Sequence, residues 1–270
     1  IARRQRQMCI RDSLPIESYL ILYGCSTLYG RDDVQKAFRF IGLLAIFAFM
    51  VGCCAKTVPP LQIKRDIPIE PESVLFIGAA NAVSGETITG SAIVVEQGEN
   101  WSWAMSAGHV CYPEVTDNLI MWTDVWMTMA FNFHGEYEPI FMVALDQVHD
   151  ICVFRIPMTN LPAVPLAKEM PNIGDKVFLG AYPLGVYNPG HVPFFEGYYA
   201  GVLEGRASYT IPVTGGASGG GVVNKDGELL GVVSLAIEGF ENITLVPKLE
   251  NVQLLLDVAK KHPDRLTIVR

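Results

Sequence analysis

The sequence predicts an all-β fold of two six-stranded antiparallel β-barrels, followed by one C-terminal helix. Three observations lead to this fold class. From residue 73 onward, short runs rich in β-branched and aromatic residues alternate with turn residues. No convincing helical period interrupts these runs, which favours a closed antiparallel barrel or a sandwich. A similar number of runs precedes and follows a proline-marked connector at 159–172, so the two halves look alike.

The candidate strands follow in order along the chain. In the first half, residues 73–158, we expect strands at 73–80, 89–96, 101–106, 119–123, 125–133, 139–145 and 151–156. In the second half, residues 173–248, we expect them at 176–182, 194–203, 207–212, 219–224, 228–237 and 242–247. The segment 249–262 is predicted to be helical, because Val252, Leu255, Leu256 and Ala259 have helical spacing and Pro263 stops the helix.

The first 72 residues differ in character from the rest. Residues 1–33 are arginine-rich, lack a sustained period and resemble translated adapter sequence, so we expect them to be non-native. In 34–54, Lys36 and Arg39 precede an apolar run at 40–51, which is typical of a signal peptide and shorter than a membrane-spanning helix. Residues 51–53 resemble a bacterial lipobox, in which Cys53 would carry the lipid. Residues 55–72 are proline-spaced and typical of a linker.

This leader predicts a protein of the cell envelope. The favoured form is a membrane-anchored lipoprotein, and a plain secretory signal or an uncleaved anchor are the alternatives. The formal net charge of −8 argues against a nucleic-acid partner, because phosphate binding needs a basic surface. Of the six cysteines only Cys111 and Cys152 fall in the part expected to fold, so the chain is not a disulfide scaffold.

Three short segments carry the candidate chemistry. Ser218 stands in the glycine-rich run 214–221, which can supply a nucleophile with free backbone N–H donors beside it. His109 follows the strand at 101–106, and Asp150 immediately precedes the apolar strand at 151–156. Each segment alone also fits a glycine-rich turn, a surface histidine or a turn acid. Together they give the order histidine, aspartate, serine.

These segments resemble the trypsin-like (chymotrypsin-fold) serine proteases. S-A-G-H at 106–109 is similar to the family's T-A-A-H, the strand after Asp150 is similar to its aspartate strand, and G-A-S-G-G at 216–220 is similar to G-D-S-G-G. Residues 177–185, followed by Glu196 and Gly197, resemble the bacterial HtrA-like branch.

The resemblance implies a role for each matching residue. Ser218 would be the nucleophile, His109 the general base and Asp150 the residue that orients the histidine. The N–H groups of Gly216 and Ser218 would form the oxyanion hole. The expected substrate-binding residues are Pro212, Val213, Ser234, Leu235 and Ala236. The partner would be a polypeptide substrate, with no cofactor and no metal, and the acid-free pocket predicts a small or medium apolar residue before the scissile bond.

Some residues depart from the family pattern. Ala217 replaces the aspartate that pairs with a newly cut N-terminus, so we expect no zymogen-type salt bridge. Gly221 replaces the usual proline. Cys111 lies near the family's half-cystine position, and Cys152 is its one candidate partner in the folded part, but whether the two pair is left open. We expect the accessory PDZ domain of the HtrA-like branch to be absent, because the sequence shows no segment of that size after the helix at 249–262.

Other functions fit the sequence less well. The G-x-S-x-G pattern also occurs in α/β hydrolases, but a hairpin rather than a helix follows Ser218 and the acid and histidine precede it. A protease-fold binding lipoprotein that has lost turnover, and a structural lipoprotein with a chance triad, are alternatives. A metal site from His109, His134, His149 and Cys111 is disfavoured, because no pair has the spacing of zinc motifs.

Overall fold

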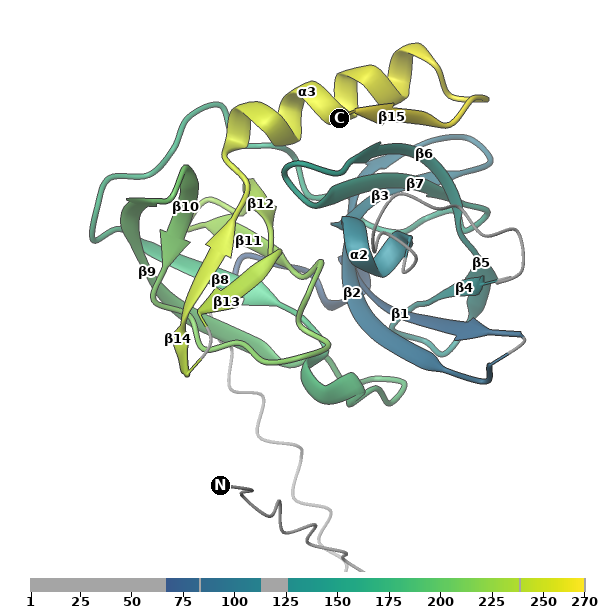
Figure 1. Ribbon diagram of the computed structural model, residues 1–270, viewed down its shortest axis with the longest axis horizontal. Coiled ribbons are helices and arrows are strands. Elements are labelled where there is room, and N and C mark those ends of the chain that lie inside the picture. The colour runs from purple at the N-terminus through teal and green to yellow at the C-terminus, as the bar shows by residue number, and fades with distance from the viewer. Residues whose placement is uncertain (1–66, 83, 113–125, 238, 270) are drawn as a thin grey trace, which may run out of the picture. The chain divides into compact units, whose positions relative to one another are not determined.

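The computed structural model describes residues 67–82, 84–112, 126–237 and 239–269 (Figure 1). The chain divides into two compact units, and the described residues belong to the second, Arg65–Arg270. The predicted non-native leader, the signal peptide or lipobox with Cys53, and most of the linker lie outside the described residues, as does the strand expected at 119–123. Within the described part, no helix is long and apolar enough to cross a membrane.

The first half of the folded unit forms an eight-stranded sheet in the order β15-β6-β7-β3-β2-β1-β4-β5. Its strands are β1 (Val74–Asn81), β2 (Thr87–Gln97), β3 (Ser102–Ala107), β4 (Trp126–Phe131), β5 (Tyr137–Pro139), β6 (Phe141–Asp146), β7 (Ile151–Ile156) and β15 (Thr267–Val269). Only Ile140 separates β5 from β6, although these strands stand near opposite ends of the sheet order. Counted as one bent strand, they curl the sheet into a six-stranded barrel to which β15 is added.

The second half repeats this arrangement in a seven-stranded sheet ordered β12-β11-β8-β9-β10-β14-β13. Its strands are β8 (Lys176–Gly180), β9 (Phe194–Leu203), β10 (Arg206–Tyr209), β11 (Gly221–Asn224), β12 (Leu229–Val232), β13 (Leu235–Ile237) and β14 (Phe240–Val246). The two end strands, β12 and β13, are consecutive in the chain and separated by Val233 and Ser234. The bend between them therefore lies where the sheet curls back on itself.

In the described part of the unit, four helical segments connect the strands or follow them. Two 3₁₀ helices, η1 (Pro71–Ser73) and η2 (Pro183–Gly185), and a four-residue helix α2 (Gly108–Cys111) lie in connections. Helix α3 (Leu249–Lys261) leaves the second sheet and packs against β6 and β7 of the first (Figure 1). The chain then returns as β15, which pairs in parallel with β6.

The core joins both sheets and α3. One buried cluster contains Val74, Ile93 and Met105 from the first sheet, Tyr182 and Val223 from the second half, and Val252, Leu255 and Leu256 from α3. Burial of this apolar surface is what holds the two sheets together, because each sheet alone would leave one face exposed. The site described below lies at this junction.

The predicted fold class is confirmed: the described unit is all-β, with two curled antiparallel sheets and one C-terminal helix. The helix predicted over 249–262 is present as α3, which ends one residue earlier, at Lys261. The strand predicted at 207–212 ends at Tyr209, and the one predicted at 228–237 is interrupted at 233–234. The elements that were not expected are β15, α2, β5 and the two 3₁₀ helices. β15 has only three residues and pairs through tertiary contact with β6, so its sequence alone carries no strand signal.

Candidate active site

His109 stands on α2, directly after β3 ends at Ala107. Val110 and Cys111 are buried and anchor this turn, whereas the His109 side chain keeps 47% of its surface exposed. Gly108 makes room here, because a Cβ at this position would lie 3.0 Å from Asp150 Oδ1 and 3.2 Å from its carbonyl carbon, which is closer than most Cβ contacts. The small residue before the histidine therefore lets the aspartate approach.

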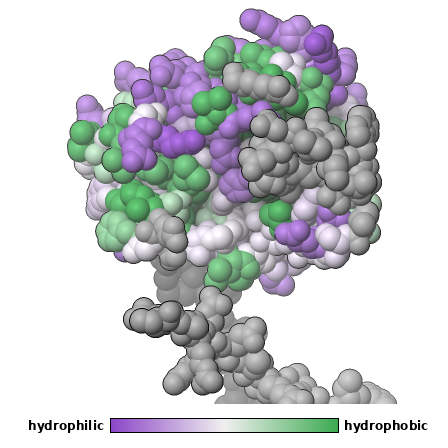
Figure 2. Space-filling view, in the orientation of Figure 1, coloured by the Kyte–Doolittle hydropathy of each residue, from purple (hydrophilic) through white to green (hydrophobic). Residues whose placement is uncertain are grey.

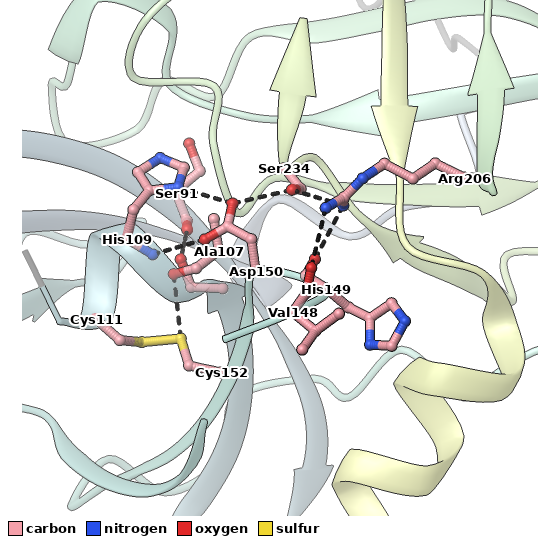
Figure 3. A network of polar contacts seen from close by, with 11 residues as sticks. Ser91, Ala107, His109, Cys111, Val148, His149, Asp150, Cys152, Arg206 and Ser234 are labelled. Carbon is pink, nitrogen blue, oxygen red and sulfur yellow. Dashed lines mark hydrogen bonds and ion pairs between the residues drawn. A yellow bond between two sulfur atoms is a disulfide. The ribbon is translucent and has the colours of Figure 1, made fainter. Parts of the chain in front are cut away.

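Asp150 closes the turn between β6 and β7 and binds His109 twice (Figure 3). Its Oδ1 accepts the His109 backbone N–H at 2.9 Å, and its Oδ2 lies 2.9 Å from His109 Nδ1. Oδ2 also accepts the hydroxyl of Ser234 at 2.9 Å. A carboxylate can only accept, so the Nδ1 atom must carry a proton. In the neutral ring, Nε2 is then left with a lone pair and can take a proton from a substrate-side group.

The loop that carries Ser218 is held by Ser91 of β2, which is fully buried. The Ser91 N–H donates to the Ser218 carbonyl at 2.8 Å, and its hydroxyl donates to the Gly216 carbonyl at 2.8 Å. The same hydroxyl accepts the N–H of Tyr182 at 2.8 Å. One residue of the first sheet, through its backbone N–H and its hydroxyl, thus fixes both ends of the G-A-S segment. Sequence reasoning missed Ser91, although a lone serine within the buried apolar run of β2 was an available signal.

In the part of the chain that the structure describes, the serine loop leaves some of its backbone N–H groups without a protein acceptor. Ala217 donates to Thr214 and Gly220 donates to Ala217, but within the described residues the N–H groups of Gly216 and Ser218 have no acceptor. Gly216 has φ 86° and is buried. These two N–H groups thus flank the serine without a protein acceptor, and donors in this position can bind an anion or a carbonyl oxygen.

The structure brings Ser218 to the same junction as His109 and Asp150 through the bend after β12. The Gly219 N–H donates to the Val233 carbonyl at 2.7 Å, and the next residue, Ser234, donates to Asp150. Among the described contacts, no hydrogen bond joins the side chains of Ser218 and His109. Hydrogen bonds between catalytic side chains often have long donor–acceptor distances in structures without substrate.

Ser218 lines a cleft of about 170 Å³. The other lining residues are Val213, Thr214, Gly215, Val233, Ser234, Leu235, Ala236 and Ile237. Four of the five predicted substrate-binding residues therefore lie here. Pro212 does not: it is exposed and outside the lining, because the chain turns inward only at the following residue, the buried Val213.

A disulfide ties the histidine segment to the aspartate segment. Cys111 and Cys152 are bonded; Cys111 lies two residues after His109, and Cys152 lies two residues after Asp150 (Figure 3). The pairing that the sequence left open is therefore present. The bond closes a loop with a sequence separation of 41, which removes about 4 kcal/mol of chain entropy from the unfolded state in a simple loop-closure model.

The two other histidines considered for a metal site, His149 and His134, make local contacts. His149 Nδ1 lies 2.7 Å from the buried Asp146, which also accepts the His149 backbone N–H. His134 lies in the turn after β4, where its N–H donates to the side chain of Asn132. No group of three or more potential ligands is arranged to hold a metal within the described ranges.

Beneath the serine loop lies the buried phenol of Tyr182. Burial, with a smaller contribution from nearby Tyr187, raises the pKa of Tyr182 above the usual tyrosine range. Burial also raises the pKa of Tyr187. Both rings pack against Phe76 of β1. These phenols are therefore neutral at physiological pH and support the loop by packing rather than by charge.

Similarity to known proteins agrees with this geometry. The model of the trypsin-like peptidase domain matches residues 89–232, which is more than half of the chain. No curated protein matches the sequence.

Several solved structures share the fold. The serine endoprotease from Yersinia pestis has 20% identity and a TM-score of 0.56, over 71% of this chain and 65% of that one. The HtrA-type protease AlgW with a tripeptide has 17% identity and a TM-score of 0.58, over 72% of this chain and 62% of that one. The Rv3671c protease from M. tuberculosis, in its active form, has 18% identity and a TM-score of 0.56, over 69% of this chain and 80% of that one.

The chain thus spans less than two thirds of the length of the first two of these structures. At these identities the likeness concerns the fold alone, and one of the three structures is described as an HtrA-type protease. The match of the peptidase family over residues 89–232 carries the assignment further: this chain belongs to the family of trypsin-like peptidases, with a two-barrel chymotrypsin-like fold.

Proposed function

We propose that this protein is a serine endopeptidase that cleaves peptide bonds through an acyl-enzyme on Ser218. The observation that carries the proposal is that the Asp150 carboxylate binds both the backbone N–H and the ring Nδ1 of His109. This leaves Nε2 as the basic atom of the ring. The free N–H groups of Gly216 and Ser218 support it independently.

The proposed mechanism follows from these groups. The Ser218 hydroxyl attacks the scissile carbonyl carbon while His109 Nε2 takes its proton. The carbonyl oxygen becomes negative and is bound by the Gly216 and Ser218 N–H groups, of which one such donor is commonly worth about 3 kcal/mol in the transition state. His109 gives the proton to the leaving amine, and water then hydrolyses the acyl ester by the same steps in reverse order. Asp150 stays ionised and stabilises the protonated ring.

A fluorophosphonate probe tests this function. We expect the wild-type protein to be labelled on one serine and the Ser218→Ala variant to lose labelling completely, because the phosphorus forms its bond with the activated hydroxyl. Labelling is read by mass spectrometry of the intact protein and of its peptides. Folded wild-type protein that takes no label would instead favour a peptidase-fold binding protein without turnover.

The cleft beside Ser218 predicts the residue accepted before the scissile bond. Its described lining carries no charged side chain, and its rim includes Leu235, which is 46% exposed. Leu235 and Phe240 of the second sheet are both exposed hydrophobic residues. Figure 2 shows hydrophobic patches, in green, on the side of the surface where Figure 1 places this sheet. A charged side chain in this cleft would be desolvated without a partner, which is costly.

We therefore expect peptides with alanine, valine or leucine at this position to be cleaved at least about 10-fold faster, in kcat/KM, than matched peptides with arginine or aspartate. The measurement is a series of chromogenic peptides that differ at this one position. The same substitutions on the far side of the scissile bond provide the control. Equal or faster cleavage of the arginine peptide would contradict the predicted preference.

A further inference from the structure

Arg206 reaches the aspartate turn from the other sheet. It stands at the start of β10, and its Nη1 donates to the His149 carbonyl at 2.9 Å and to Ser234 Oγ at 3.1 Å. Its Nη2 donates to the Val148 carbonyl at 3.4 Å. Figure 3 shows His109, Asp150, Ser234 and Arg206 as one connected row. The guanidinium thus touches the two residues before Asp150 and the hydroxyl that binds Asp150.

Arg206 determines where the Ser234 proton points. A guanidinium can only donate, so Ser234 Oγ must act as acceptor toward it. The single hydroxyl proton is then available for the buried side of Asp150 Oδ2, at 2.9 Å. Ser234 is 3% exposed, so water offers little competition. Without Arg206, the hydroxyl could equally donate to a neighbouring backbone carbonyl, and Asp150 Oδ2 would lose one of its two donors.

Arg206 also holds the backbone that presents Asp150. Asp150 has φ 57°, a left-handed conformation that side-chain-bearing residues adopt only where the surroundings impose it. The two carbonyls bound by Arg206 belong to the residues immediately before this position. Within the described part of the chain, Arg206 forms no ion pair with a carboxylate. Its hydrogen bonds go to this turn and to Ser234.

We propose that Arg206 is a positioning residue for catalysis, which acts on His109 through Ser234 and Asp150. The proposal rests on the proposed peptidase function and adds a residue to it that no part of the sequence resemblance includes. Arg206 does not itself line the cleft, and its one contact with a lining residue is the hydrogen bond to the buried hydroxyl of Ser234. Its removal should therefore change the rate of the chemical step and leave substrate binding nearly unchanged.

The test compares Arg206→Ala and Arg206→Lys with the wild type. For Arg206→Ala we expect kcat on an apolar chromogenic peptide, and the fluorophosphonate labelling rate, to fall by about 10- to 100-fold while KM changes less than about twofold. Lysine can reach one of the three acceptors, so Arg206→Lys should recover part of the loss. Arg265→Ala, which removes an exposed arginine after α3, is the matched control and should keep the wild-type rate.

A second set of measurements isolates the path through Ser234. In a Ser234→Ala background, Arg206→Ala should cost at least about threefold less than in the wild type, because the shared contact is already lost. The NMR resonance of the His109 Nδ1 proton should shift in Arg206→Ala and not in Arg265→Ala. Additive losses, an unchanged resonance, or a loss confined to KM or to thermal stability would overturn the proposal.

The two proposals fail in different ways. Wild-type protein that takes no fluorophosphonate label refutes the peptidase function, and Arg206 is then judged by the Nδ1 resonance alone, which needs no turnover. Wild-type protein that is labelled, with Arg206→Ala labelled equally fast, refutes the positioning role and leaves the peptidase function standing.

Discussion

Replacing Asp150 with asparagine is expected to lower kcat/KM by about 10³- to 10⁴-fold while the protein remains folded. The carboxylate accepts three hydrogen bonds, from the His109 N–H, from His109 Nδ1 and from the Ser234 hydroxyl. An amide has one accepting oxygen, so its NH₂ must face at least one of these donors. If it faces Nδ1, the ring carries its proton on Nε2 and no longer serves as a base. If it faces the backbone N–H, two donors oppose each other and the ring is displaced.

Asp146→Asn is the matched control for this prediction. Asp146 binds His149 through Nδ1 and the backbone N–H, as Asp150 binds His109, but in a pair away from the cleft. Both variants remove a charged acceptor and should cost about 1–3 kcal/mol in unfolding free energy. Peptide kinetics and thermal melts separate the two effects. An Asp146→Asn loss of activity as large as that of Asp150→Asn would refute the specific role of the His109 pair.

Replacing Gly219 with alanine is expected to cost at least about 4 kcal/mol of stability, or to prevent folding. Gly219 has φ 86°, which an L side chain rarely adopts. A Cβ there would also lie far inside van der Waals contact with the carbonyl oxygen of Ser91 and the hydroxyl of Ser106. Both atoms are fixed, since the Ser106 hydroxyl donates to that carbonyl at 2.6 Å. For a unit of about 200 residues this cost corresponds to a fall in Tm of about 8–16 °C.

Gly215→Ala provides the comparison within the same loop. A Cβ at Gly215 meets nothing within 4 Å, and its φ is not in the left-handed region. Its unfolding free energy should therefore change by less than about 1 kcal/mol. Thermal and chemical denaturation, followed by circular dichroism, measure both variants. Equal stability of Gly219→Ala and Gly215→Ala would show that Gly219 is not packed closely against the Ser91 carbonyl and the Ser106 hydroxyl.

The parts of the fold that could be predicted are those encoded locally. Strand alternation gave β1, β7 and β9, and the spacing of four apolar residues gave α3 with its bounds. His109 and Asp150 stand where a strand ends and where one begins, so their segments could be recognised from neighbouring residues alone. The structure joins these two side chains directly and places Ser218 on the loop beside them.

The parts that could not be predicted depend on residues far apart in sequence. Ser91 and Gly216 are 125 residues apart, and no local sequence pattern predicts the hydrogen bond between them. Because position 217 has no aspartate, the sequence does not show what supports the serine loop. In the structure the Ser91 hydroxyl binds the Gly216 carbonyl and is itself bound by the N–H of the buried Tyr182. The cysteine pairing stayed open for the same reason, since a disulfide needs positions in space that spacing along the chain does not give.

The Cys111–Cys152 bond also has a consequence for how the protein is handled and assayed. It closes a covalent ring that contains the peptide bonds between these two residues, Asp150 included. A single proteolytic cut anywhere in that ring, by the protein itself or by a contaminant, leaves the two pieces joined. Such a nicked molecule runs as one band on a gel without reductant and as two bands with it. Intact mass under non-reducing conditions therefore shows only one added water, and reduction then separates the two pieces.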